Sequence, residues 1–189
     1  MPRTSPNPPS WDRLFETAAA QDGHVTTTQA SDAGFSSQLL AHYVKVGRVL
    51  RVHRGVYRLA LYPRGDHEDL TALWLWTGQL AVVSHETALA LHGLSDALPS
   101  AHDVTLPPSW KSRRVKYPPG LRPHFADVPD PERTWFGAVP ITTPLRTVVD
   151  CYADHVPPDL VEQAVRDGVR RGDFTRAQVS AARRARAAA

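Results

Sequence analysis

The stretch from residue 24 to residue 59 constrains the fold more than any other part of this sequence. It reads HVTTTQASDAGFSSQLLAHYVKVGRVLRVHRGVYRL. The first part holds two short helical patterns on either side of Gly34, and the second holds two β-branched runs on either side of Gly55. This order of patterns predicts two helices joined by a turn, followed by a two-stranded hairpin.

The boundaries of the two helices are marked by capping residues. Thr26 and Gln29 have the spacing of a capping box, which predicts a helix start, and Gly34 can take the left-handed conformation that a tight stop needs. Ser36 offers a side-chain oxygen to begin the second helix, which we expect to run to about Val46. Both helices are therefore predicted to be short and close together in the chain.

The second helix has two different faces. Leu39, Tyr43 and Val46 follow helical spacing and are expected to be buried. A polar and partly basic face is expected to point outward, formed by Gln38, Ala41, His42 and Lys45. A helix-turn-helix followed by a hairpin is a winged helix-turn-helix, in which the second helix enters the major groove of duplex DNA.

The charges of this segment are of one sign. Residues 36–58 contain five basic side chains and no acidic one, and contacts between cations and DNA phosphates release condensed counterions. We expect the DNA-binding surface to comprise Ser36, Ser37, Gln38, Ala41, His42, Lys45, Arg48, Arg51, Arg54 and Arg58. Lys45 and Arg48 are expected on phosphate, and Arg54 at the wing tip on phosphate or in an A/T-rich minor groove. The candidates for base edges are Ser37, Gln38, Ala41 and His42. The alternative is a winged helix that docks a protein, with its basic residues merely solvated.

Composition is compatible with a folded protein of one or two domains. The chain has 189 residues, 42% of them hydrophobic, a formal net charge of +3 and a single cysteine, Cys151. A lone cysteine excludes an intrachain disulfide and suits a reducing compartment. No apolar run approaches the roughly 20 residues of a membrane span. We expect a cytoplasmic protein that does not enter a membrane.

The rest of the chain predicts a second domain. Residues 1–9 are expected to be a disordered tail, residues 10–62 the winged domain, and residues 66–189 a C-terminal domain, with the boundary in the Pro- and Gly-containing segment 61–66. The fold class is α+β, the C-terminal domain being a mixed α/β domain with a small sheet and terminal helices. Its expected strands lie at 81–83, 103–107, 113–117, 121–126 and 134–142. Its expected helices lie at 67–78, 84–92, from Thr143, at 158–171 and from Thr175 to the end.

Three blocks of the sequence together resemble a known family. They are the stretch from Gly23 to Leu59, the block AVVSHETALALHGLSD from Ala81, and the block VPITTPLRTVVD from Val139. In this order, from about residue 12 to 172, they resemble AbiEi-type antitoxins of bacterial toxin–antitoxin systems. The resemblance implies an N-terminal winged helix that binds operator DNA to repress its own operon. It also implies a C-terminal domain that helps to counteract a nucleotidyltransferase toxin encoded next door.

The sequence offers little for an enzyme. His85 and His92 lie seven residues apart without a completing ligand, and Cys151 with His155 lacks an orienting acid. Pro129-Asp130 suggests a nuclease motif, but the last lysine lies upstream of it, at Lys116, and a nucleotidyltransferase would need a Gly-Gly or Gly-Ser turn that the sequence does not contain. We therefore expect no enzymatic activity, no cofactor and no metal site.

The final helix is strongly basic, and its role is left open by the sequence. Its arginines are Arg176, Arg183, Arg184 and Arg186. They form a possible secondary basic surface, which is either solvated, a second DNA contact or a dock for an acidic toxin surface. For the whole protein, the alternatives to an antitoxin are a protein-interaction module and a transcriptional regulator without a toxin partner.

Overall fold

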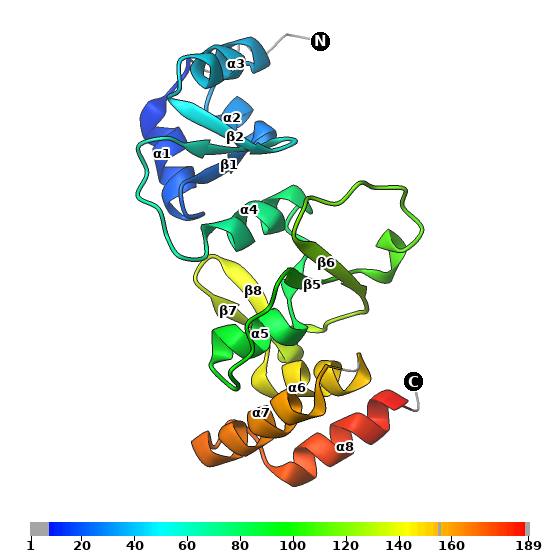
Figure 1. The fold of residues 1–189 in the computed structure, drawn as a ribbon. Coiled ribbons are helices and arrows are strands. Elements are labelled where there is room, and N and C mark those ends of the chain that lie inside the picture. Colours follow the sequence, from blue (N-terminus) through cyan, green and yellow to red (C-terminus); the bar gives the residue numbers. More distant parts are fainter. Residues whose placement is uncertain (1–7, 155, 188–189) are drawn as a thin grey trace. The chain divides into compact units, whose positions relative to one another are not determined.

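The computed structural model describes residues 8–154 and 156–187, and the chain divides into two compact units between Gln79 and Leu80 (Figure 1). Seven of the nine residues expected to form a disordered tail, residues 1–7, lie outside the described residues. Unit 1 and unit 2 are described separately below. The fold is mixed α/β, as the sequence predicts.

Unit 1 consists of four helices and a three-stranded antiparallel sheet. Its elements are α1 (Trp11–Ala19), β1 (His24–Thr26), α2 (Thr27–Asp32), α3 (Ser37–Lys45), β2 (Val49–His53), β3 (Val56–Leu59) and α4 (Glu68–Trp76). The strand order is β1-β3-β2, so β3 is the central strand. Helices α2 and α3 followed by the β2–β3 hairpin form the predicted winged helix-turn-helix, which Figure 1 shows in blue to cyan.

The core of unit 1 lies between the first three helices and the sheet. Its buried residues are Leu14, Ala18, Val25, Ala30, Ala33, Phe35, Leu40, Val49 and Leu59. The ring of Trp11 meets Phe35 and Tyr43 edge to face, at centroid distances of 4.9 and 4.8 Å. Such aromatic pairs add to the free energy gained from burial, and they connect α1 to the turn between α2 and α3 and to α3 itself.

Helix α4 belongs to unit 1, although the sequence places the domain boundary before it, at 61–66. Ala72 and Leu75 of α4 form a buried cluster with Val56 of β3. Glu68, in the first turn of α4, forms an ion pair with Arg58 of β3. The compact unit therefore ends after α4, because this helix covers part of the winged sheet, and the Pro- and Gly-containing segment before it is a loop within the unit.

Unit 2 is built on a five-stranded mixed sheet with helices at its C-terminal end. Its strands are β4 (Val82–Val83), β5 (His102–Leu106), β6 (Leu121–Phe125), β7 (Arg133–Phe136) and β8 (Val139–Thr142). Its α-helices are α5 (His85–His92), α6 (Pro144–Ala153), α7 (Pro158–Arg171) and α8 (Arg176–Ala187), and its 3₁₀ turns are η1 (Pro108–Trp110) and η2 (Asp130–Glu132). The strand order is β6-β5-β4-β8-β7, in which β5–β6 and β4–β8 are parallel pairs and the others antiparallel.

Two strand predictions in unit 2 are corrected by the structure. Residues 113–117 form no strand, because these mostly exposed residues pair with no neighbouring strand and lie between the turn η1 and Pro118. The predicted strand at 134–142 is two strands, β7 and β8. Gly137 separates them with a φ of +54°, a conformation that turns the chain into a hairpin.

The helices of unit 2 share a second hydrophobic core. Its buried residues are Leu89, Leu94, Ala97, Val148, Cys151, Val156, Val161, Ala164, Val165, Phe174 and Val179. Gly168 of α7 lies against the ring of Phe174, where a Cβ atom would approach to 2.2 Å. Only a glycine fits there, which explains how the chain after α7 can turn back closely enough to bring α8 against α6.

A buried carboxylate connects α8 to α6. Asp150 of α6 has no exposed surface. Its Oδ1 accepts a hydrogen bond from Arg146 Nε and forms an ion pair with Arg186 Nη2, each at 2.8 Å. The pairing of Arg146 with Asp150 one turn apart is the one predicted from the sequence. Arg146 also forms an ion pair with Glu132 and donates to the backbone carbonyl of Asp127. Arg186 of the final helix is therefore part of the internal packing of unit 2.

We predict that Asp150→Asn destabilises unit 2, because it removes the buried carboxylate shared by Arg146 and Arg186 and leaves only Glu132 as an ion-pair partner of Arg146. Breaking a buried ion pair costs up to about 3–5 kcal/mol, and the partial exposure of Arg186 reduces this. Urea denaturation measures the loss of free energy of unfolding, and hydrogen exchange of the α8 amides locates it. Asp130→Asn is the control, since the Asp130 side chain is 98% exposed. Equal stability of the two variants would contradict the prediction.

Candidate DNA-binding surface

The turn between α2 and α3 is fixed by local hydrogen bonds and by one buried ring. Thr26 and Gln29 form the predicted capping box at the start of α2, each side chain bonding the other residue's backbone N–H. Gly34 has a φ of +90°, which lets the chain reverse after α2. Phe35 then enters the core, and its amide donates to the carbonyl of Ala30 at 2.9 Å. The capping box and Gly34 were predicted from the sequence, whereas the burial of Phe35 is seen only in the structure.

Helix α3 begins at the predicted residue and presents the predicted outward face. The Ser36 side chain accepts a hydrogen bond from the backbone N–H of Leu39 at 3.2 Å and so caps the helix. The residues expected on the DNA side are all exposed: Ser37, Gln38, Ala41, His42 and Lys45. Ser36 therefore has a structural role as the N-cap of α3. The other five residues lie within the helix and point their side chains to solvent.

The inner face of α3 differs from the predicted stripe by one position. Leu40 is the buried residue, whereas Val46 is 52% exposed and Leu39 and Tyr43 are only partly buried. Val46 lies at the C-terminal cap, where the helix has ended and the core no longer covers the side chain. The buried side of α3 is therefore turned from the predicted stripe towards Leu40, and the polar outer face is still exposed.

The wing is connected directly to the start of α2. Gly55 occupies the hairpin turn with a φ of +79°, as predicted. Its carbonyl accepts hydrogen bonds from the Thr27 backbone N–H at 3.0 Å and from Thr27 Oγ1 at 3.3 Å. Arg51 and Arg54 are exposed on the hairpin. Because the turn is bonded to the helix-turn-helix, the exposed arginine at its tip keeps a defined position relative to the helices.

Arg48 lies between α3 and β2 and is held over aromatic rings. Its guanidinium carbon is 4.5 Å from the ring centroid of Trp11 and 5.5 Å from that of Tyr43. Cation–π contacts of this kind orient an exposed guanidinium without neutralising it. Arg48 is therefore a cation held in place just after the C-terminal end of α3. Its contact with the ring of Trp11 was not predicted from the sequence.

Arg58 was predicted to contact DNA, and the structure shows that this is wrong. Its side chain is buried, with only 3% of the residue exposed. Arg58 Nε is 2.9 Å from Glu68 Oε2, Nη1 donates to the carbonyl of Leu59 and Nη2 to the carbonyl of Tyr62. Because β3 is the central strand, between β1 and β2, and α4 packs against it, Arg58 has a structural role in attaching α4 and the preceding loop.

The remaining basic residues of the winged segment are all exposed. Lys45, Arg48, Arg51 and Arg54 are exposed, and residues 36–58 contain no carboxylate to neutralise them. Nearby His24 is buried, and burial lowers its pKa below the usual value, so it stays neutral inside the core near neutral pH. The positive charge of the winged segment is thus carried by its surface, where it can meet phosphate groups.

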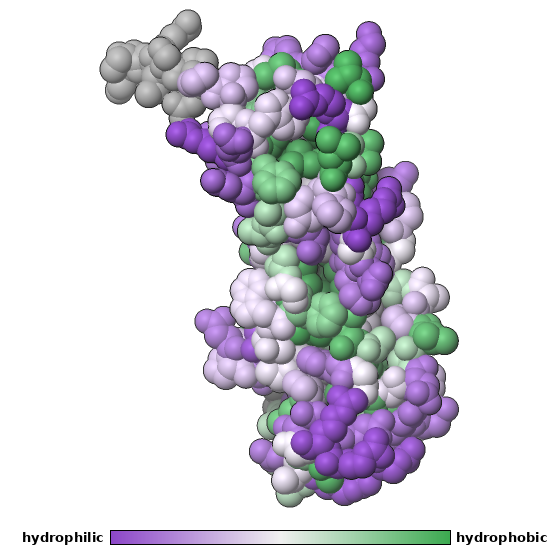
Figure 2. Space-filling model, turned by 90° about the vertical axis from the view of Figure 1, so that its left-hand side faces the viewer, coloured by the Kyte–Doolittle hydropathy of each residue, from purple (hydrophilic) through white to green (hydrophobic). Residues whose placement is uncertain are grey.

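In unit 2, the basic final helix is only partly available. Arg186 is bonded to Asp150, and the guanidinium carbon of Arg183 lies 3.8 Å from the ring centroid of Tyr152. Arg176 and Arg184 are exposed on α8. Figure 2 shows hydrophilic residues gathered over the region of α7 and α8. Two of the four arginines of the expected secondary basic surface are therefore involved in contacts within unit 2.

The enzymatic candidates of the sequence do not come together as a nucleophilic site. Cys151 is buried, and burial raises its pKa well above the ordinary value, so it remains a thiol. Position 155, its expected helical partner, lies outside the described residues. His92 bonds the carbonyl of Thr142 at 2.8 Å and does not join His85. His85 instead stacks on the ring of His124, a neighbour that no sequence spacing indicated.

Comparison with known proteins identifies the winged segment. Residues 12–60 match the model of a family described as "Transcriptional regulator, AbiEi antitoxin". The resemblance to AbiEi antitoxins is confirmed over this segment. The match spans the elements from α1 to the end of the hairpin and includes the first of the three sequence blocks, while the second and third blocks lie outside it. The comparison with curated proteins gives no match.

The segment that matches the AbiEi family is the one that carries the exposed polar face and the basic wing. The matched segment contains α3 with its exposed polar face and the wing with Arg51 and Arg54. The family is one of transcriptional regulators rather than enzymes. Among the described residues, no helix is both long and apolar enough to cross a membrane.

We predict that Ser36→Ala loosens α3 by about 1 kcal/mol, the usual cost of losing a side-chain N-cap. Hydrogen exchange of the α3 amides measures this cost as faster local opening. Ser37→Ala is the matched control, since Ser37 is the next residue, is also exposed, and is not the capping residue. Equal protection of the α3 amides in both variants would show that Ser36 does not cap the helix in solution.

Proposed function

We propose that this protein is an antitoxin that binds its own operator through the winged helix and represses its operon. The observation that carries this proposal is the exposed, one-signed group of Lys45, Arg48, Arg51 and Arg54 around a polar helix face, within the segment that matches AbiEi antitoxin regulators. A surface of this kind matches the charge of duplex DNA, and phosphate contacts supply most of the affinity of a regulator for DNA.

Each part of the surface has a distinct role in this proposal. Ser37, Gln38, Ala41 and His42 face base edges in the major groove; a glutamine suits bidentate contact with adenine, and an alanine suits the methyl group of thymine. Lys45 and Arg48 lie on phosphates at the other end of the helix. Arg51 and Arg54 follow the backbone from the wing, and Arg54 at the tip is the residue with access to a minor groove.

We predict that the double variant Lys45→Ala, Arg54→Ala weakens binding to the DNA upstream of its own gene and flattens the salt dependence. Each lost phosphate contact reduces the slope of log K against log salt by about 0.9. Gel shift or fluorescence anisotropy at several salt concentrations measures both effects. Arg114→Ala, Lys116→Ala is the matched control, because it also removes one exposed arginine and one exposed lysine, but from unit 2 and outside both basic surfaces. The repressor proposal fails if wild-type protein shows no salt-sensitive affinity for this DNA.

The antitoxin role is a second part of the proposal, and it rests on the family description and on the separate compact unit that follows the winged unit. We propose that the C-terminal unit counteracts a nucleotidyltransferase toxin encoded next to this gene. The double DNA-binding variant should then still rescue growth of cells that express the toxin from an independent promoter. Rescue that is lost in this variant, or a neighbouring gene whose product is not toxic, would contradict a neutralising role for the C-terminal unit.

A further inference from the structure

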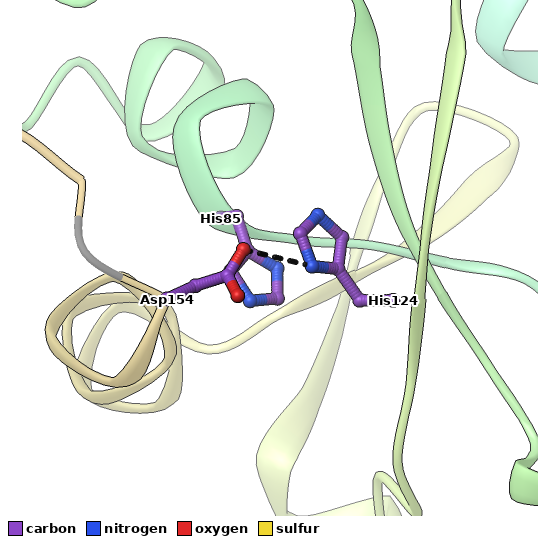
Figure 3. Close-up of side chains that lie close together, drawn as sticks. All are labelled: His85, His124 and Asp154. Atoms are coloured by element: carbon purple, nitrogen blue, oxygen red, sulfur yellow. Dashed lines mark ion pairs between the residues drawn. The ribbon is translucent and has the colours of Figure 1, made fainter.

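Three polar side chains from separate parts of unit 2 meet at one point. His85 begins α5, His124 lies on β6, and Asp154 follows the end of α6 (Figure 3). One ring nitrogen of each histidine and one carboxylate oxygen all lie within 4.8 Å of one another. Among the metal candidates weighed from the sequence was His85, but with His92 in place of His124 and Asp154, and the proposed DNA-binding surface includes none of the three.

His124 is oriented by a buried carboxylate. Its Nε2 is 2.9 Å from Oδ1 of Asp103, which has no exposed surface, and its Nδ1 is 3.1 Å from Oδ2 of Asp154. Asp103 is itself held by Thr87, whose hydroxyl bonds the Asp103 carboxylate and backbone N–H. Metal-binding histidines are commonly fixed in this way, with one ring nitrogen donating to an outer carboxylate while the other faces the ion.

His85 supplies the second imidazole of the cluster. It has a φ of +52°, a left-handed conformation that is costly for a residue with a side chain, and its Nδ1 is 2.9 Å from Oγ of Ser84. Burial, together with the neighbouring His124, lowers the pKa of His85 to about 3, so the ring is neutral at ordinary pH. When its Nδ1–H donates to Ser84, the lone pair on Nε2 remains for another partner.

We propose that His85 Nε2, His124 Nδ1 and the carboxylate of Asp154 bind one divalent first-row transition ion, with Zn²⁺ as the probe. Two imidazoles and one carboxylate suit such ions, whereas Ca²⁺ and Mg²⁺ prefer sites made of oxygen. Asp154 has a side chain that is 53% exposed, so water can reach the ion and complete a four-coordinate shell.

Binding requires a small local adjustment. The two rings are nearly parallel, 14° apart with centroids at 3.6 Å, so one must turn before both lone pairs point to one ion. Ligand atoms around Zn²⁺ are about 3.3 Å apart, which follows from bond lengths near 2.0–2.1 Å. The contact between His124 Nδ1 and Asp154 Oδ2 at 3.1 Å opens as the ion takes that position, and any proton on Nδ1 passes to solvent.

The test is a Zn²⁺ titration of the full, untagged and metal-free chain by calorimetry. We expect one Zn²⁺ ion per chain and a rise in Tm with Zn²⁺ concentration, because an ion that joins α5, β6 and α6 stabilises the folded state. Asp154→Asn should weaken binding at least about tenfold, the lower end of what even an outer-shell partner contributes. His85→Gln should do the same, and His67→Gln, an exposed histidine of unit 1, should bind as the wild type does.

Asp154→Asn keeps the test independent of folding, because Asp154 is exposed and its replacement leaves the buried His124–Asp103 pair in place. The Tm of this variant without metal should equal that of the wild type. Co²⁺ should give the absorption of a tetrahedral site in the wild type and lose it in both cluster variants. Absence of saturable Zn²⁺ binding overturns the proposal, and so does unchanged affinity in Asp154→Asn and His85→Gln, which would place the ion on other histidines.

Discussion

The burial of Leu40 and Phe35 beneath α3 is the interaction on which the DNA-facing surface depends. Leu40 is 2% exposed and shares the core with Phe35 from the preceding turn. Because these two side chains fix one side of a short helix, the opposite side must face solvent, and that side carries Gln38, His42 and Lys45. A polar helix face becomes a surface for recognition only when the apolar side of the same helix is anchored.

The wing shows how one hairpin can contribute to both the surface and the interior. Arg54 at the turn is exposed, while Arg58 of β3 is buried and paired with Glu68 of α4. A buried guanidinium without its carboxylate would be costly, so the pair fixes where α4 begins. The result is a wing whose tip remains available to a ligand while its base is attached to the rest of unit 1.

Unit 2 uses its charges in two separate networks. Asp150 gathers Arg146 and Arg186 and so attaches the final helix, whereas Asp103 orients His124 within the cluster that includes His85 and Asp154. The first network explains why a basic helix need not be a binding surface along its whole length. The second brings two imidazoles close to a carboxylate that is exposed to water, which is the arrangement that the proposed metal site uses.

The sequence by itself determined the local elements of this protein. Capping residues and glycines fixed the ends of α2 and α3, the hairpin turn at Gly55, and the starts of α6 and α8, because these signals act between residues three or four positions apart. The exposed face of α3 followed from the same short-range periodicity, with an error of one position on its buried side. Such features can be predicted because the interacting groups are neighbours in the chain.

Only the tertiary structure decided which charged residues remained outside and which distant residues met. Arg58 looked like the other arginines of the wing, but the packing of α4 on the central strand buried it. The domain boundary moved past α4 for the same reason. His85 was brought to His124 by the pairing of β5 with β6, and to Asp154 by the packing of α5 on α6. These outcomes depend on contacts between segments far apart in the sequence, and no local pattern records which segments will meet.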